Sequence, residues 1–249
     1  MPTIDNRLVA CLPAADRTRL MALCEPVQLR LEQVLGEPGQ RTSHVYFPVD
    51  GFISSIARVD SHHGLEVGIA GDEGMVGAHL ALGVSRQPLR LLVRGSGSAW
   101  RMAAAPFREE LLRSAALAVR VRRYMYVAMV QRATLAACLR FHEIGPRLAR
   151  WLLMSQDRAH ADHFAATQEF VATMLGVRRV GVTTAAGVLH KRGLIDYHRG
   201  EMRILDRAGL EAASCTCYKT DLGTYANTMG DLQRGGARLQ AKVAVVEGG

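Results

Sequence analysis

Between residues 27 and 102, hydrophobic and polar residues alternate in short runs with Gly, Pro or Asp at the breaks. This pattern is typical of β-strands separated by tight turns, and six runs every eight to twelve residues favour an all-β barrel or sandwich. The predicted strands cover Val27–Leu31, Val45–Phe47, Phe52–Ala57, Leu65–Ile69, Leu89–Val93 and Ser98–Met102. Before them, residues 6–25 predict an amphipathic helix or helix pair, in which Pro13 and Asp16 mark a second start.

From Pro106 the hydrophobic spacing becomes helical, with steps of three and four residues up to Leu139. No Gly or Pro interrupts this stretch, so it predicts a helix of about 45 Å at 1.5 Å per residue. The spacing is that of a coiled-coil seam over about four heptads, which favours dimerisation over a helix buried in one core. The predicted dimer seam is Leu111, Ala118, Val121, Met125, Ala128 and Leu135, with Arg132 as an unexplained charge on it.

Gly145 and Pro146 end or kink that helix. The next helix, residues 147–158, is expected to bury Leu148, Trp151 and Leu152 and to expose Arg147 and Arg150. Residues 160–164 then cross to a further helical segment.

Residues 167–189 predict two short helices joined by Gly176. Thr167 suits an N-cap, and Gly176 can adopt the positive φ that ends a helix. The second helix, starting at Arg178, turns Val182, Ala185 and Leu189 inward and keeps two arginines at its outward N-terminal end. This arrangement is typical of a helix-turn-helix, which presents that end to the major groove of DNA; the alternative is an ordinary helical hairpin.

A hairpin, 194–198 and 202–205, follows the second helix directly and predicts a wing with Arg199 at its tip. A short helix is expected from Leu210. We therefore predict an α+β chain: a barrel with N-terminal helices at 1–105, a dimerisation helix at 106–140, a winged helix-turn-helix at 141–218, and a partly disordered tail at 219–249.

The net charge of +8 is concentrated in the second half of the chain, with +5 in residues 101–139 and +4 in residues 140–219. Such a distribution suits a polyanion-binding half, although a solvated basic face would give the same count. No apolar run is long enough for a membrane span, and the N-terminus lacks the pattern of a secretory signal, so a cytoplasmic location is expected.

The sequence lacks the motifs of common catalytic sites: it contains no HExxH, no Gly-x-Ser-x-Gly and no phosphate-binding loop with Lys. We therefore expect no enzyme and no catalytic residue. The five cysteines are scattered, and Cys215 and Cys217 form the one close pair. Without a second pair at zinc-finger spacing, reduced thiols are expected rather than a metal site.

Barrel, long helix and winged helix-turn-helix, in this order, resemble the Crp/Fnr superfamily of transcription regulators over about residues 6–218. The motifs that carry the resemblance are residues 45–51, 73–77, 147–154, 167–179 and 193–200. The resemblance implies a homodimer on a pseudo-palindromic operator, a cyclic-nucleotide-binding-like jelly-roll as sensor, and RNA polymerase as a partner.

The motif positions imply base contacts for Arg179, Val180 and Thr184, and phosphate contacts for Thr167, Gln168, Arg178, Thr183 and Arg199. Arg179 can donate two parallel hydrogen bonds to guanine, while Val180 suits a thymine methyl group. Gly181 lies inside the second helix, where Gly costs about 1 kcal/mol relative to Ala, and it is expected to allow close approach of the backbone to DNA.

For the sensor, the family's pocket positions are Gly74, Gly77 and Ala78, with Arg86 and Arg90 as the nearest cations. Cyclic-nucleotide binders carry Gly-Glu and then Arg-Ser or Arg-Ala here, and this chain has neither. No cyclic AMP or GMP and no other cofactor is therefore expected. The effector stays open: an unidentified ligand, haem through His62, His63 or His79, or none, with a purely structural barrel.

Overall fold

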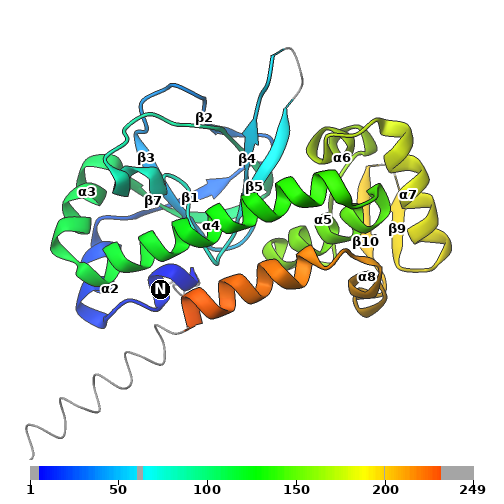
Figure 1. Ribbon diagram of the computed structural model, residues 1–249. Coiled ribbons are helices and arrows are strands. Elements are labelled where there is room, and N and C mark those ends of the chain that lie inside the picture. The colour runs from blue at the N-terminus through cyan, green and yellow to red at the C-terminus, as the bar shows by residue number, and fades with distance from the viewer. Residues whose placement is uncertain (1–5, 61–63, 199, 231–249) are drawn as a thin grey trace, which may run out of the picture.

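The computed structural model describes residues 6–60, 64–198 and 200–230. Figure 1 shows a β-rich domain and a helical domain joined by one long helix, α4. The N-terminal residues form a pair of helices, α1 (Arg7–Ala10) and α2 (Ala14–Ala22), and the second begins after Pro13, as predicted. The strands of the first domain are β1 (Glu25–Leu29), β2 (Val34–Gly36), β3 (His44–Pro48), β4 (Phe52–Ala57), β5 (Leu65–Ala70), β6 (Arg90–Gly95) and β7 (Gly97–Ala103).

These strands form two antiparallel sheets, one in the order β1-β7-β3 and the other in the order β2-β6-β4-β5. Their alternating hydrophobic side chains fill the space between and beside the sheets, where Val45, Phe47, Ile53 and Val93 are fully buried. A 3₁₀ helix, η1 (Ala78–Leu82), follows β5 and packs near α4. The predicted jelly-roll is therefore confirmed.

The long helix begins later than the sequence pattern predicted. Helix α3 (Ala104–Arg113) ends at Ser114, and α4 (Ala115–Phe141) starts there. Ser114 has extended backbone angles, and its hydroxyl accepts a hydrogen bond from the Leu117 N–H at 3.0 Å while donating to Asp16 at 2.8 Å. A serine that caps a helix in this way competes with continuation of the previous helix, so the predicted uninterrupted helix from Pro106 is wrong.

The second domain contains α5 (Ile144–Ala159), β8 (His163–Ala165), α6 (Gln168–Leu175), α7 (Arg179–Lys191), β9 (Ile195–His198), β10 (Glu201–Ile204) and α8 (Arg207–Ala213). The predicted wing is confirmed: β9 and β10 pair antiparallel, and β8 adds a third strand in the order β8-β10-β9. Gly145 and Pro146 lie in the first turn of α5, where a Pro without its N–H is tolerated.

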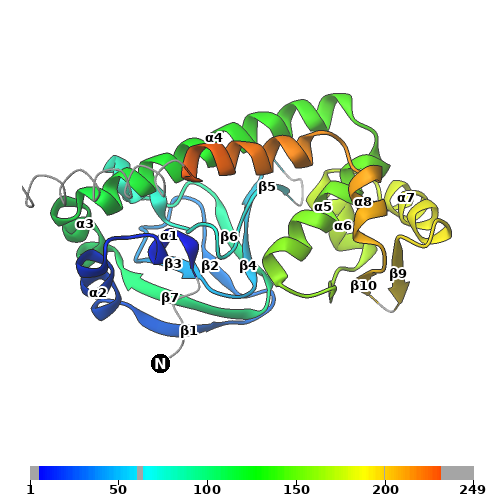
Figure 2. The same ribbon diagram turned by 90° about the horizontal axis from the view of Figure 1, so that it is seen from below.

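Residues 217–230 form a further helix where the sequence analysis expected the start of a weakly patterned tail. Figures 1 and 2 show this helix, in orange, running beside α4. Tyr225 and Met229 pack against the apolar core of the β-domain, and the Arg123 guanidinium donates to the Thr228 carbonyl at 3.1 Å. The helix is stabilised by these tertiary contacts, which its sequence alone does not reveal; residues 231–249 lie outside the described part. None of the helices in the described ranges is long and apolar enough to cross a membrane.

Candidate nucleic-acid interface and effector cavity

Helices α6 and α7 form the predicted helix-turn-helix. Thr167 caps α6 by accepting the Phe170 N–H at 3.2 Å, and Gly176 ends it with φ at +63°. A residue with a Cβ would be strained at this φ, so Gly suits the turn. The inward side chains are buried, among them Val171, Val182, Ala185 and Leu189. They join Leu148 and Trp151 of α5 in one apolar cluster.

The outward face of α7 carries the predicted DNA-contacting residues. Arg178, Arg179, Thr183 and Thr184 are exposed, and the Val180 side chain is 73% exposed. The exposed Val180 side chain is free to contact a partner that approaches this face of α7. Arg178 and Arg179 lie at the N-terminal end of α7, where they can approach a groove first.

Two predicted phosphate contacts are held in a fixed relation by the fold. The Thr183 hydroxyl donates to Gln168 Oε1 at 2.6 Å, so the start of α6 and the first turns of α7 are joined across their outer surface. Thr167 is also exposed beside them. Arg199, the predicted wing contact, lies outside the described residues.

Gly181 serves packing inside the protein. A Cβ at this position would lie 2.6 Å from Cδ1 of Ile144, the first residue of α5. The missing side chain therefore lets α7 lie close to α5, and the expected close approach to DNA at Gly181 is not supported.

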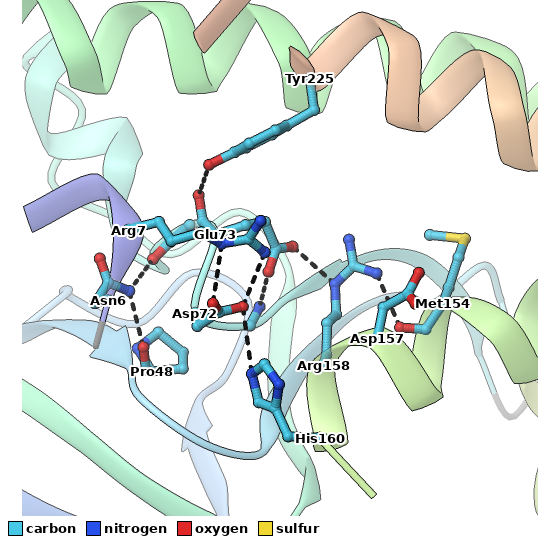
Figure 3. Close-up of polar contacts among 12 residues, drawn as sticks. Asn6, Arg7, Pro48, Asp72, Glu73, Met154, Asp157, Arg158, His160 and Tyr225 are labelled. Carbon is cyan, nitrogen blue, oxygen red and sulfur yellow. Dashed lines mark hydrogen bonds and ion pairs between the residues drawn. The ribbon is translucent and has the colours of Figure 1, made fainter. Parts of the chain in front are cut away.

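The helical domain is docked on the β-domain through buried polar contacts, which Figure 3 shows in part. Arg158 of α5 forms an ion pair with Glu73 at 2.7 Å, and both side chains are less than a tenth exposed. Although burial acts in the opposite direction, the Glu73 carboxylate raises the pKa of Arg158 above its ordinary value. Nearby, Asp72 pairs with Arg7 at 2.9 Å, and the Tyr225 hydroxyl donates to the Glu73 carbonyl at 2.9 Å.

A second set of contacts joins the domains around Glu66 of β5. Its carboxylate accepts hydrogen bonds from the Trp151 indole at 2.9 Å and the Ser54 hydroxyl at 2.5 Å. Burial raises the pKa of the Glu66 carboxyl, and these two hydrogen bonds oppose that rise only partly. The Arg94 guanidinium lies 3.1 Å from the ring centroid of Phe170, which adds a cation–π contact between β6 and α6.

A cavity of about 440 Å³ lies between the β-domain, α4 and the helical domain. This volume is in the range of small-molecule sites. Among the predicted pocket residues, Gly77 and Ala78 line it. The rest of its wall is mainly apolar and includes Val67, Ile69, Met75, Leu89, Met125, Leu135, Met154 and Leu175. Its polar members are Ser55, Glu66, His79, Gln87, Tyr124, Gln131, Arg132, Arg147 and Arg150.

The other predicted pocket residues have different roles. Gly74 lies directly against the ring of Tyr124, so its missing side chain lets α4 approach the β-domain. The Arg86 guanidinium donates to the Gly39 carbonyl at 2.7 Å, and Arg90 pairs with Glu37 at 3.4 Å. Gly74, Arg86 and Arg90 do not line this cavity, so their assignment to an effector pocket stays a prediction.

The predicted dimer seam faces inward in the described chain. Val121 is fully buried in the β-domain core, Leu111 packs against the same core from α3, and Ala118 is half-buried. Met125, Ala128 and Leu135 line the cavity. The periodicity was correctly identified, but a core-facing stripe and an intersubunit stripe have the same spacing, so sequence alone could not separate them.

Arg132 lies on α4 and lines the cavity. Its guanidinium lies within 3.5 Å of the position that a Cβ on Gly68 would occupy, and its Nη1 donates to the Ala128 carbonyl at 3.1 Å. The charge that interrupted the apolar seam is therefore an exposed cation at the cavity wall. Sequence analysis missed Tyr124 and Arg132 as cavity residues; Arg132 was signalled only as an unexplained charge in an apolar stripe.

The model of the Crp-like helix-turn-helix domain family matches residues 146–213. Residues 146–213 are a Crp-like helix-turn-helix domain. The matched range runs from the first turn of α5 to the end of α8, and so includes the wing as well as α6 and α7. No curated protein matches the chain by sequence.

Solved structures show that the fold is shared with other proteins over about four fifths of the chain. A transcriptional regulator assigned to this family from Eubacterium rectale has a TM-score of 0.65 at 16% identity, covering 83% of this chain and 97% of its own. The cyclic-di-GMP-responsive regulator CLP from Xanthomonas campestris has a TM-score of 0.62 at 16% identity, with 77% and 99% covered. A Crp-family regulator from Thermus thermophilus has 0.61 at 17%, with 76% and 96% covered.

The Crp-like domain carries less surface charge than the sequence suggests. Arg147, Arg150 and Arg158 are all buried, whereas Arg147 and Arg150 were expected on the surface. Arg147 donates to the Leu175 carbonyl at the end of α6, and Arg150 pairs with Asp221 of the 217–230 helix at 2.5 Å. Asp221 lies in the segment expected to be a tail, so sequence analysis had no partner to assign to Arg150.

Proposed function

We propose that the protein is a dimeric, sequence-specific DNA-binding transcription regulator of the Crp/Fnr type. The observation that carries the proposal is the division of α7 into two faces: Val182, Ala185, Ala186 and Leu189 are buried, while the N-terminal outer face is exposed and basic. An exposed, rigid helix end with two arginines fits the major groove, where base edges can be read.

The chemistry of each exposed residue on this surface suits one kind of proposed DNA contact. Arg179 is proposed to donate two hydrogen bonds to a guanine, and exposed Val180 to pack on a thymine methyl group. Thr184 completes the base-reading set. Thr167, Gln168, Arg178 and Thr183 are proposed to fix the register through phosphate contacts, since the Thr183–Gln168 hydrogen bond already holds the two helices together.

Dimerisation is proposed through an outer stripe of α4, consisting of Val119, Arg122, Tyr126, Met129, Ala133, Ala136 and Arg140. These residues follow a heptad spacing, and all are exposed. Val119, Tyr126 and Met129 are 36%, 52% and 59% exposed, which is unusual for apolar side chains at such regular spacing. A second copy of the same helix presents the matching stripe, as a two-fold interface requires.

The proposed sensing element is the cavity between the β-domain and α4. Its wall joins both domains, because Glu66 and Gly77 come from the β-domain and Trp151 and Leu175 from the helical domain. A ligand that fills it would change the docking of the Crp-like domain, provided that its affinity differs between docked and undocked states. The chain lacks the Gly-Glu and Arg-Ser or Arg-Ala anchors of cyclic-nucleotide binders, so the proposed effector is another small molecule. Its apolar part would contact the mainly apolar wall, and its polar part would reach Arg132.

Selection of duplexes from a random pool tests the DNA-binding proposal. The wild-type protein is expected to enrich one pseudo-palindromic sequence, whose binding weakens with salt by about 0.9 in logarithmic slope per phosphate contact. Arg179→Ala should lose about 1–3 kcal/mol of preference at one guanine in each half-site. Arg113→Ala removes the same charge from the exposed end of α3 and should leave the preference unchanged. Equal binding of all duplexes by wild type and Arg179→Ala would overturn the proposal.

The alternative is an effector-independent DNA-binding protein with a purely structural β-domain. A thermal-shift screen of cyclic mono- and dinucleotides, haem and apolar metabolites separates the two. A compound that stabilises the wild-type protein, but not a variant in which a bulkier residue replaces Met125 in the cavity wall, supports the proposal that the β-domain is a sensor. The absence of any shift, together with unchanged operator affinity across the screen, favours the structural β-domain.

A further inference from the structure

Three cysteines and a histidine from distant parts of the chain meet at the junction between α4 and the Crp-like domain. Cys138 lies in the last turn of α4, and His142 is the residue that caps that helix. Cys215 and Cys217 follow α8 and lead into the helix at 217–230. The three cysteines are buried, with exposed fractions of 1%, 6% and 7%, and they form an apolar cluster of their own.

The four potential ligand atoms are arranged for a single metal ion. All lie within 4.8 Å of one another. Cys138 Sγ is 3.6 Å from Cys215 Sγ, and Cys217 Sγ is 3.5 Å from His142 Nδ1. In a tetrahedral site with Zn–S of about 2.3 Å and Zn–N of about 2.0 Å, the edges between ligand atoms are about 3.5–3.8 Å. The two measured pairs already have this separation.

The local backbone explains how these four atoms converge. Cys138 and His142 are four residues apart, so they lie on the same side of the helix end. The Cys215 N–H donates to the Pro146 carbonyl at 3.3 Å and the Tyr218 N–H donates to the Cys215 carbonyl at 3.1 Å. These bonds form a turn, anchored to the first turn of α5, that presents Cys215 and Cys217 to the end of α4.

We propose that Cys138, His142, Cys215 and Cys217 form a structural Zn²⁺ site that ties the end of α4 to the end of the Crp-like domain. Three thiolates and one imidazole are a common structural zinc ligand set, and the proposed site leaves no open position for catalysis. With three thiolates the bound ion has a net charge of −1. Arg147 is buried in the same domain, and within the described residues it forms no ion pair with a carboxylate.

The site lies at the connection between the two domains. Residues 142 and 143 are the only non-helical link between α4 and α5, and His142 is one of the proposed ligands. Bound zinc would therefore hold this link and the start of the 217–230 helix in one arrangement. The proposal concerns metal binding and does not depend on DNA recognition.

The test uses the full-length protein purified under reducing conditions from cells grown with zinc. Elemental analysis is expected to find about one zinc per chain, and replacement by Co²⁺ should give the thiolate charge-transfer and visible bands of a tetrahedral cobalt site. Cys215→Ser and His142→Ala should each lose these bands and most of the zinc. Cys24→Ser, a substitution in the half-buried Cys24 outside the cluster, is the control and should keep both.

Hydrogen exchange provides a readout that does not require the variants to fold perfectly. Removing zinc from the wild-type protein with a chelator should speed exchange at residues 139–146 and 214–218 by more than tenfold, and adding zinc should restore it. A wild-type chain without zinc and without cobalt bands would overturn the proposal. So would a Cys138–Cys215 disulfide in the reduced preparation, or full zinc content in both ligand variants.

Discussion

The ion pair between Glu73 and Arg158 allows a quantitative test of how the two domains are held together. Glu73→Gln keeps the shape of the side chain but removes its charge, leaving the Arg158 guanidinium buried without a counter-charge. Both side chains are less than a tenth exposed, so water cannot screen the loss. Removing one partner of a buried pair costs about 3–5 kcal/mol. For a chain of this size that corresponds to a decrease of about 6–20 °C in the unfolding midpoint.

Separation of the two domains would reduce the loss of stability caused by Glu73→Gln. The helical domain can move away from the β-domain and expose Arg158 to water, so the loss cannot exceed the free energy of docking. In that case thermal unfolding shows a smaller decrease, and hydrogen exchange increases at residues 71–75 and 154–160 even though both domains stay folded. Either result measures the contribution of the pair.

Glu25→Gln is the matched control. It breaks the Glu25–Arg101 pair at 2.7 Å, but the two side chains are 57% and 34% exposed, so the expected loss is about 1 kcal/mol or less. The double variant Glu73→Gln/Arg158→Met should recover most of the stability, because no buried charge remains. An unfolding midpoint and exchange pattern of Glu73→Gln equal to those of Glu25→Gln would refute the reasoning.

Three further outcomes follow from the same structure. Gly187 has open space around it, so Gly187→Ala should stabilise the protein by about 1 kcal/mol through helix propensity. Gly181→Ala should stabilise it less, because the new methyl group must displace the Ile144 side chain. Operator affinity should be unchanged in both variants, and weaker DNA binding by Gly181→Ala alone would instead place Gly181 at the DNA. Because the folded-state pKa of Glu66 is raised above its ordinary value, the stability that the protonated carboxyl contributes is present at low pH and is lost as the pH rises through the raised pKa. Glu66→Gln, neutral at every pH, should lack this decline in urea unfolding, and parallel pH profiles would contradict it. Tyr126→Asp should shift the protein from dimer to monomer in analytical ultracentrifugation, whereas Leu31→Asp, at a 41% exposed position between β1 and β2, should not.

The fold could be predicted largely from local patterns, because each element carries its own signal. Alternation gave the strands, Pro13 gave the start of α2, and Gly176 gave the turn of the helix-turn-helix with its observed positive φ. Ser114 shows the limit of this approach. The residues on both sides of Ser114 continue a helical period, so the sequence pattern shows no break there. The break depends partly on the hydrogen bond between Ser114 and Asp16 of α2, a contact between residues distant in sequence.

The candidate sites differ in how far sequence could reach. The exposed outer face of α7 could be predicted because its residues lie within one short motif. The cavity and the Cys138–His142–Cys215–Cys217 cluster could not, because their members are distant in sequence and are brought together by tertiary structure. Spacing rules for zinc ligands search for two close pairs of ligands, and here one pair is a Cys and a His on a helix end.

Methylation interference on the selected operator tests most directly whether α7 lies in the major groove of two half-sites. Methylation of guanine N7 blocks the acceptor that Arg179 is proposed to use. We predict interference at one guanine in each half-site, with the two positions related by two-fold symmetry and their centres about one helical turn, 34–36 Å, apart. The interference should disappear in Arg179→Ala and persist in Arg113→Ala. Binding that is indifferent to N7 methylation in both half-sites would contradict the proposed recognition.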